Sequence, residues 1–184
     1  MLQVSFGSFP VLETQRLRLR KLIDTDVNEL FNLRSQEQVM KYIARPLPKN
    51  KADIYQLIQA INRSFDENEG ITWAITLKDQ PQLIGTIGFW RIMKEHFRAE
   101  VGYMLEPAFH NQGIMHEALA AALDFGFSKL GLHSVEANIS PENIASRQLV
   151  AKNNFVKEAH FKENYYYNGV FLDSVIYSLI TPLK

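Results

Sequence analysis

The chain has 184 residues and no cysteine, and its 20 Lys and Arg residues balance its 20 Asp and Glu residues. This length suits one domain with a sizeable core, and the lack of cysteine excludes disulfides, thiolate metal sites and a cysteine nucleophile. Zero formal charge gives no electrostatic reason to expect nucleic acid or an anionic membrane as a partner. No segment approaches the roughly 18 uninterrupted apolar residues of a membrane span, so we expect a soluble cytoplasmic protein.

Leucine and arginine alternate near the amino end, in residues 12–22. Because successive strand side chains point to opposite faces, this pattern predicts one half-buried strand with Leu17 and Leu19 inside. The basic side chains between them would form a solvated face rather than an anion site, namely Arg16, Arg18 and Arg20.

Two helical patterns follow this strand. Thr25 is expected to cap the first helix, which runs through Leu30 and Leu33, and the second covers residues 51–67. Pro46 and Pro48 separate the two helices.

Strand patterns dominate after Gly70, with helical periodicity at residues 113–130 and 143–152. Turns are expected at residues 78–81 and at Asn168-Gly169. The predicted strands cover residues 71–77, 82–93, 99–105, 133–139, 155–161 and 170–181. Strands interleaved with helices, without a repeat or a linker, predict one domain over residues 1–184 with a mixed α/β sheet.

The most informative stretch is a strand, a polar loop with Gly113 and an alanine-rich helix. Free N–H groups at a helix start, together with the helix dipole, can hold an anion, and a glycine lets a phosphate approach the backbone. The alternative is a loop that only caps a core helix. The loop has neither the several glycines of a dinucleotide fingerprint nor the Gly-Lys-Ser/Thr of a P-loop.

Residues 110–115 read HNQGIM and resemble the pyrophosphate loop of the GNAT acetyltransferases, Arg/Gln-x-x-Gly-x-Gly/Ala. Gly113 matches that pattern. His110 stands where Arg or Gln is usual, Met115 where a small residue is usual, and His116 where Thr or Ser is usual.

The flanking segments strengthen this resemblance and narrow it to the RimJ/RimL branch. Residues 99–107, AEVGYMLEP, are similar to the strand before the loop, and residues 135–147, VEANISPENIASR, to a later strand and helix. Asn154 replaces the glycine usual before Phe155, a mild departure because Asn tolerates a left-handed conformation. The resemblance implies the GNAT fold, a twisted and mostly antiparallel mixed sheet of about seven strands flanked by about four helices.

The resemblance also implies an acetyl-CoA site and no metal. Backbone groups on the strand would hold the pantetheine arm and supply the oxyanion donor, and loop N–H groups would hold the diphosphate. Without the family, Met104 and Leu105 are simply strand core. The cofactor residues implied are Tyr103, Met104, Leu105, Asn111, Gln112, Gly113, Ile114, Met115, His116, Asn143 and Ser146.

Two residues are expected to be catalytic. Ser146 would hydrogen-bond the departing sulfur, or else satisfy a carbonyl of its own helix. Asn143 would cap that helix or contact the cofactor. Glu100 would take the amine proton through water, or else be a solvated strand-end carboxylate paired with Arg98. His96 and His110 are weaker candidates for the base, and Glu117 is expected to be structural.

The predicted reaction is transfer of an acetyl group from acetyl-CoA to a primary amine in a ternary complex. An α-amine costs about 1.4 kcal/mol to deprotonate at pH 7 and a lysine-type amine about 4.6 kcal/mol, so the lack of a strong base favours an α-amine, as on a protein N-terminus. Polyamines and antibiotics stay open as acceptors. The alternative functions are a non-catalytic acyl-CoA-binding module and a binder of another phosphate ligand.

Two further features concern partners. We expect a monomer or a homodimer. Acceptor specificity is assigned to residues 40–51 and to the final hairpin, where Tyr165, Tyr166 and Tyr167 wall an acceptor slot or pack at a dimer contact.

Overall fold

The computed structural model describes residues 1–2 and 4–181. Residue 3 and residues 182–184 of the predicted domain lie outside this part. The strands are β1 (Leu12–Glu13), β2 (Leu17–Lys21), β3 (Ile71–Leu77), β4 (Gln80–Met93), β5 (Arg98–Leu105), β6 (Ser134–Ile139), β7 (Val156–Tyr167) and β8 (Val170–Ile180). The helices are α1 (Val27–Ser35), α2 (Glu37–Met40), α3 (Lys51–Asp66), α4 (Ile114–Ser128) and α5 (Ile144–Lys152).

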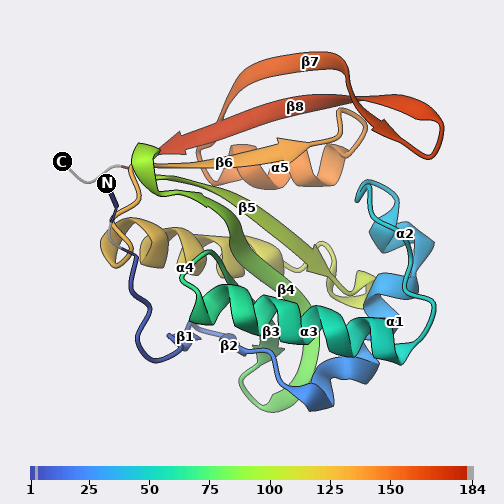
Figure 1. Cartoon of the computed structure of the whole chain (residues 1–184), viewed down its shortest axis with the longest axis vertical. Helices are drawn as coiled ribbons and strands as arrows, with labels where there is room; N and C mark the ends of the chain where they lie inside the picture. The colour runs from blue at the N-terminus through green and yellow to red at the C-terminus, as the bar shows by residue number, and fades with distance from the viewer. Residues whose placement is uncertain (3, 182–184) are drawn as a thin grey trace.

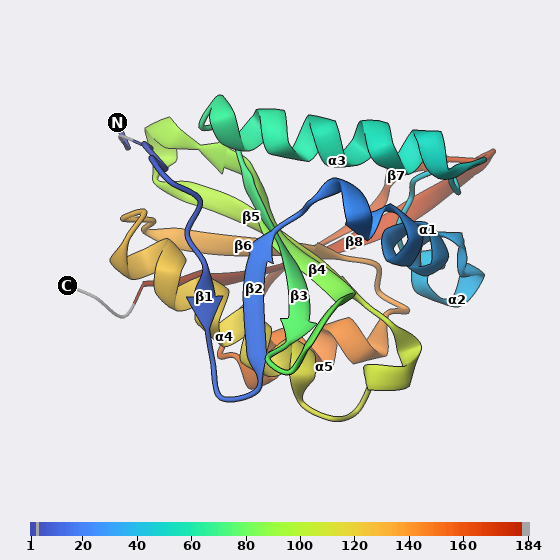
Figure 2. The same ribbon diagram turned by 90° about the horizontal axis from the view of Figure 1, so that it is seen from below.

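In the described part of the chain, the strands form one 8-stranded sheet in the order β1-β2-β3-β4-β5-β6-β8-β7. Every neighbouring pair is antiparallel except β5 and β6. Figure 2 shows α3 on one face of the sheet and α4 on the other. Figure 1 shows β7 and β8 as a long hairpin that extends past the body of the sheet. The predicted mixed sheet is therefore confirmed.

The strand predicted over residues 12–22 is wrong as one element. The chain turns at Thr14–Arg16, and β1 folds back onto β2 with Leu12 opposite Leu19. This break gives eight strands instead of about seven. Leu17 and Leu19 are fully buried as expected.

The cap assigned to Thr25 is also wrong. Thr25 lies inside a 3₁₀ turn, Asp24–Asp26, and Asp26 directly precedes α1. The Asp26 carboxylate instead accepts hydrogen bonds from the Ile23 N–H and from the guanidinium of Arg20. A carboxylate accepts stronger hydrogen bonds than a hydroxyl does. The Asp26 side chain therefore fixes the turn before α1, which the Thr25 hydroxyl was expected to do.

The other differences concern short elements. Helix α2 was not predicted, because its single turn gives no periodic pattern to detect. The turn expected at residues 78–81 is shorter, since Leu77 pairs with Gln80 and β4 begins there. None of the helices in the described residues has the length and apolar content of a membrane span.

The core has two parts, one on each face of the sheet. The larger part joins α4 to the buried sides of β2 to β6, and the smaller joins α1 and α3 to β3 and β4. Ala118 and Ala122 of α4 are completely buried, which lets the helix lie close to the sheet. Side chains of β5 therefore alternate between the α4 face and the α1–α3 face.

Candidate active site

The sheet opens between its two parallel strands. β5 and β6 pair only where Arg98–Glu100 faces Ser134–Glu136, although β5 continues to Leu105 and β6 to Ile139. The second half of β5 therefore has β4 as a neighbour on one edge and a gap on the other.

The register of β4 and β5 shows which backbone groups face this gap. The N–H of Glu106 donates to the carbonyl of Ile84 at 2.8 Å. Hydrogen-bonded pairs alternate along an antiparallel ladder, so Met104 pairs with Thr86 in the same way. Of the residues expected to hold the pantetheine arm, Tyr103 and Leu105 thus direct their backbone groups into the gap, whereas those of Met104 point towards β4.

Ser146 lies beside the gap and contacts β5. Its Oγ is 2.6 Å from the Oη of Tyr103. This bond replaces the carbonyl of its own helix that was considered as an alternative partner. Asn143 caps α5, because its side-chain oxygen accepts the N–H of Ser146 at 3.1 Å. The cap holds the first turn of α5, and with it Ser146, against β5.

The loop before α4 has a shape that suits an anion. Asn111 and Gly113 have positive φ values of 59° and 75°. The N–H of Glu117 bonds the Gly113 carbonyl at 3.0 Å, so the preceding amides of Ile114, Met115 and His116 lie at the open end of the helix. A buried ring nitrogen of His116, Nδ1, has no hydrogen-bond partner among the described residues. A phosphate oxygen would satisfy these donors, so the loop fits the diphosphate of acetyl-CoA.

An ion pair between Arg16, which directly precedes β2, and Glu117 of α4 holds this loop in place. Glu117 of α4 accepts hydrogen bonds from Thr14 and from both the N–H and the Nε of Arg16. Arg16 Nη1 also donates to the carbonyl of Gln112 at 2.9 Å. These bonds hold the pKa of Glu117 below its usual value despite partial burial. Glu117 is structural, as expected.

The prediction of a solvated arginine face holds for Arg16 and Arg18, which are exposed, whereas Arg20 is partly buried. Arg16 is paired with Glu117 and Arg20 with Asp26. Arg18 is exposed too and lies 3.7 Å from Glu13. Alternation along one strand could not reveal the partner of Arg16, because Glu117 is 101 residues away in the chain.

His110 occupies the far end of the gap. Its Nε2 is 3.0 Å from the carbonyl oxygen of Leu105. The unusual residue at this position of the loop thus ties the loop to the end of β5.

Glu100 has an environment that suits a base. Its side chain is 8% exposed, and the nearest cation is Arg91, with Nη1 3.4 Å from Oε2. Burial raises the pKa of Glu100 to about 7, with Arg91 opposing the shift and Glu136 adding to it. Arg98, considered as its partner, pairs instead with Glu136 at 2.7 Å. The alternative of a solvated carboxylate paired with Arg98 is therefore wrong.

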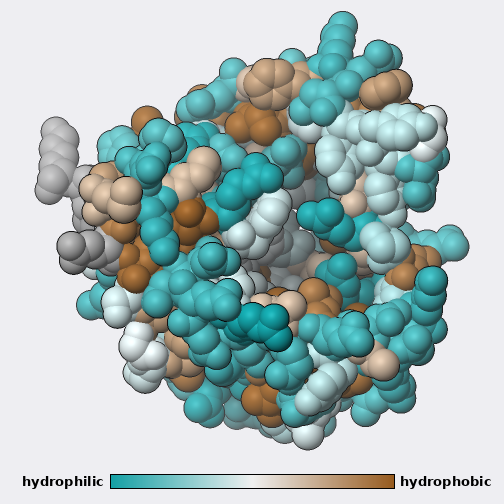
Figure 3. Space-filling model, in the orientation of Figure 1, coloured by the Kyte–Doolittle hydropathy of each residue, from teal (hydrophilic) through white to brown (hydrophobic). Residues whose placement is uncertain are grey.

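The face that carries Glu100 is where an acceptor would approach. By strand alternation, Glu100, Gly102 and Met104 share the face covered by α1 and α3, opposite α4. Figure 3 shows this face hollowed between the β7–β8 hairpin, α1–α2 and α3, with a mostly hydrophilic rim.

A cation lies on this same face. Arg34 of α1 is half-buried, and its Nη1 is 3.9 Å from the sulfur of Met104. Burial and the neighbouring charge of Arg45 lower the pKa of Arg34. No carboxylate of the described residues lies within 4.0 Å of its guanidinium. Sequence reasoning missed Arg34, because nothing in the helical pattern distinguishes it from a surface arginine.

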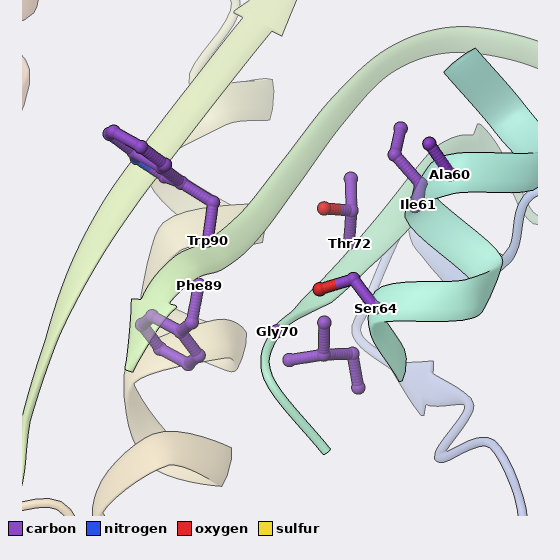
Figure 4. Close-up of a pocket in the computed structure, with 8 residues that line it drawn as sticks. Ala60, Ile61, Ser64, Gly70, Thr72, Phe89 and Trp90 are labelled. Atoms are coloured by element: carbon purple, nitrogen blue, oxygen red, sulfur yellow. The ribbon is translucent and has the colours of Figure 1, made fainter. Parts of the chain in front are cut away.

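A separate shallow pocket of about 210 Å³ lies between α3 and strands β3 and β4 (Figure 4). It is lined by Ser64, Gly70 and Trp90 among others, and by none of the predicted site residues. Figure 4 shows the indole of Trp90 pointing away from α3. This indole lies over Gly102 of β5. This pocket is too shallow to hold the cofactor.

Comparison with known proteins decides the family. Residues 16–156 match the acetyltransferase (GNAT) domain. The chain belongs to the GNAT acetyltransferase family. It is 35% identical over 174 residues to the uncharacterized N-acetyltransferase YoaA of Bacillus subtilis (strain 168), covering 95% of this chain and 98% of that one. It is an acetyl-CoA-dependent N-acetyltransferase, as the sequence predicted.

The chain is also similar to two acetyltransferases of ribosomal proteins, one in sequence and one in fold. The [ribosomal protein uS5]-alanine N-acetyltransferase of Escherichia coli (strain K12) is 28% identical over 123 residues, 66% of this chain and 63% of that one. The structure of RimL, a ribosomal L7/L12 α-N-protein acetyltransferase in complex with coenzyme A, superposes with a TM-score of 0.84 at 21% identity, over 95% of this chain and 100% of that one. The GNAT fold is confirmed. Among the described residues, no group of three or more His, Asp or Glu is placed to hold a metal.

Proposed function

We propose that this enzyme acetylates the α-amine of a protein N-terminus, with Glu100 as the base. The observation that carries this proposal is a buried carboxylate on the acceptor face whose pKa lies at about 7. A base is most effective when its pKa is near the working pH. An α-amine with a pKa of about 7.7–8.0 matches such a base, whereas a lysine-type amine near 10.4 does not.

The remaining residues divide the work of the reaction. The amides of residues 111–116 would hold the diphosphate, and the gap-facing backbone of Tyr103 and Leu105 would hold the arm and stabilise the developing oxyanion. Glu100 would remove the amine proton through a water molecule as the C–N bond forms. Ser146 would donate a hydrogen bond to the sulfur as the C–S bond breaks.

The charge on the acceptor face supports a peptide over a polyamine. Arg34 and Arg45 lie close enough for their charges to interact, and Arg34 has no anionic partner in the described chain. Two like charges repel a polycation such as spermidine. The carboxylates or backbone carbonyls of a peptide acceptor would meet them favourably. Residues 40–51 and the β7–β8 hairpin flank the same hollow and would set the choice among peptides.

Three more features belong to this proposal. The chain would work as one domain in the cytoplasm, where ribosomal proteins are made, as a monomer or a homodimer. The exposed ring of Tyr166 packs at a tilt against Phe171, with the ring centroids 4.9 Å apart, and this exposed aromatic pair supports packing at a dimer contact rather than a slot wall.

The test is release of free thiol from acetyl-CoA with peptides that begin with Ser or Ala. We expect turnover with these peptides, less with the same peptides blocked at the α-amine, and less with spermidine. No turnover across the amine panel, with acetyl-CoA still bound in calorimetry, would favour the non-catalytic acyl-CoA-binding module.

Ser146→Ala separates these two functions further. Loss of rate with unchanged affinity for acetyl-CoA supports catalysis by Ser146. Unchanged thiol release would remove Ser146 from the mechanism while leaving the enzyme in place.

A further inference from the structure

Two hydroxyl groups meet beside the gap, one from each side of it. Tyr103 belongs to β5, and Ser146 to the first turn of α5, which follows β6. Their oxygens are 2.6 Å apart, a short distance for a hydrogen bond between two neutral groups. β5 and β6 are not paired at Tyr103. This hydrogen bond therefore connects the part of the sheet that contains β5 with the part that contains β6, beside the gap that would hold the pantetheine arm.

The direction of the proton follows from acidity and surroundings. A phenol is a stronger acid than an aliphatic hydroxyl and is therefore the better donor of the pair. Burial raises the pKa of Tyr103 to about 12, so the phenol keeps its proton at neutral pH. Tyr103 therefore donates and the Ser146 oxygen accepts.

This direction leaves one proton free. The Ser146 hydroxyl has a single hydrogen, and a bond donated by Tyr103 to its oxygen does not use that hydrogen. Its N–H is bonded to Asn143, so the backbone does not compete for the hydroxyl. The Ser146 hydrogen can then serve only a group that enters the gap.

We propose that Tyr103 is a positioning residue that holds the Ser146 hydroxyl with its hydrogen directed at the departing sulfur. The proposal rests on the proposed function of Ser146 and adds a role for the Tyr103 side chain, whose backbone alone was expected to matter. Donation by Tyr103 also polarises the serine hydroxyl and strengthens its bond to a developing thiolate. No proton leaves Tyr103 during the reaction.

A double-mutant cycle with Tyr103→Phe and Ser146→Ala tests this proposal. Tyr103→Phe should lower kcat about tenfold with KM for acetyl-CoA and peptide unchanged. In the Ser146→Ala background the same change should alter kcat less than about twofold, because Tyr103 acts only through the serine. Independent, additive losses would overturn the proposal, and so would an unchanged kcat for Tyr103→Phe.

The matched control is Tyr177→Phe. Tyr177 is buried, and its hydroxyl contacts Arg147 of the same helix, at 3.3 Å. This variant should keep kcat, which separates the loss of a particular hydroxyl from general loosening of α5. Melting temperatures of all variants check folding. If Tyr103→Phe does not fold, 3-fluorotyrosine at position 103, which keeps the hydroxyl, must retain kcat within about threefold, and a larger loss contradicts the proposal.

Failure of this inference and failure of the proposed function give different results. A wild-type protein without turnover contradicts the proposed function. A wild-type protein with turnover, but with additive losses in the cycle, contradicts only the role of Tyr103.

Discussion

Glu100 on β5 and Glu117 on α4 each have an arginine beside them, yet the pKa values of the two carboxylates shift in opposite directions. Glu117 accepts three hydrogen bonds, one from Thr14 and two from Arg16, and its pKa is lowered. Glu100 is buried with a single, longer contact to Arg91, and its pKa is raised to about 7. The number of donors around each carboxylate decides which form is stable.

This difference separates a carboxylate that fixes structure from one that can exchange a proton. A carboxylate surrounded by donors stays charged at neutral pH and holds its neighbours in place. A desolvated carboxylate near pH 7 gains and loses a proton at little cost. Variants at the two sites should therefore fail in different steps of the reaction.

The largest effect is expected for Glu100→Gln. The amide keeps the shape but accepts no proton, so kcat should fall about 100-fold or more, as for loss of a general base. Thiol release at saturating substrates measures it. Glu158→Gln, at an exposed site on β7, is the matched control and should keep the wild-type rate. A Glu100 variant with wild-type kcat would assign the base elsewhere.

Gly113→Ala should weaken binding of CoA. A residue with a Cβ at φ 75° is strained by about 1–2 kcal/mol, which corresponds to about a 5–30-fold rise in Kd if the loop relaxes to escape the strain. Isothermal titration with CoA measures this change. Gly131→Ala imposes the same strain at φ 70° beyond the other end of α4, and should lower the melting temperature without changing Kd. Equal Kd values for the two variants would show that the loop does not hold the diphosphate.

The pH dependence of the rate tests the environment of Glu100. The carboxylate is the active form and its pKa is about 7, so kcat should be lost as the pH falls through 7 and level off above it. Arg91 lowers this pKa, so Arg91→Gln should move the midpoint to higher pH and reduce the rate at pH 7 by a few fold. Arg18→Gln, remote on β2, should leave the midpoint in place. A midpoint that stays fixed in Arg91→Gln contradicts the assignment of the base.

The smallest effect is expected for Glu117→Gln. Its partner Arg16 is 44% exposed, so the pair contributes only about 0.4–1 kcal/mol and Kd for CoA should rise about 2–5-fold. At saturating CoA, kcat should be unchanged, in contrast with Glu100→Gln. Glu13→Gln removes two exposed ion pairs away from the loop and should not affect Kd. A loss of kcat in Glu117→Gln would contradict the assignment of a structural role to Glu117 and of the base to Glu100.

Much of this fold could be predicted from the sequence, because long elements carry a periodic signal. The strand that carries Leu17 and Leu19 and the helices α3 and α4 follow directly from the spacing of apolar residues. The break at Thr14–Arg16 and the single turn α2 could not be predicted in this way, since each is too short for a periodic pattern to repeat.

The sequence predicted which residues belong to the candidate site better than it predicted which residues they contact. Gly113, Asn143 and Ser146 stand out in the sequence because they begin helices. The contacts of Ser146 with Tyr103 and of Arg16 with Glu117 cross 43 and 101 residues of chain. Such pairs depend on how distant elements pack, and no local pattern records them.

The seam between β5 and β6 has a mechanical consequence. Only three residue pairs join a five-stranded part of the sheet, β1 to β5, to a three-stranded part, β6 to β8. A molecule seated in the gap touches both parts and bridges this narrow seam of the sheet. Its binding free energy then adds to the cohesion of the whole domain, so resistance to heat should climb with the concentration of CoA.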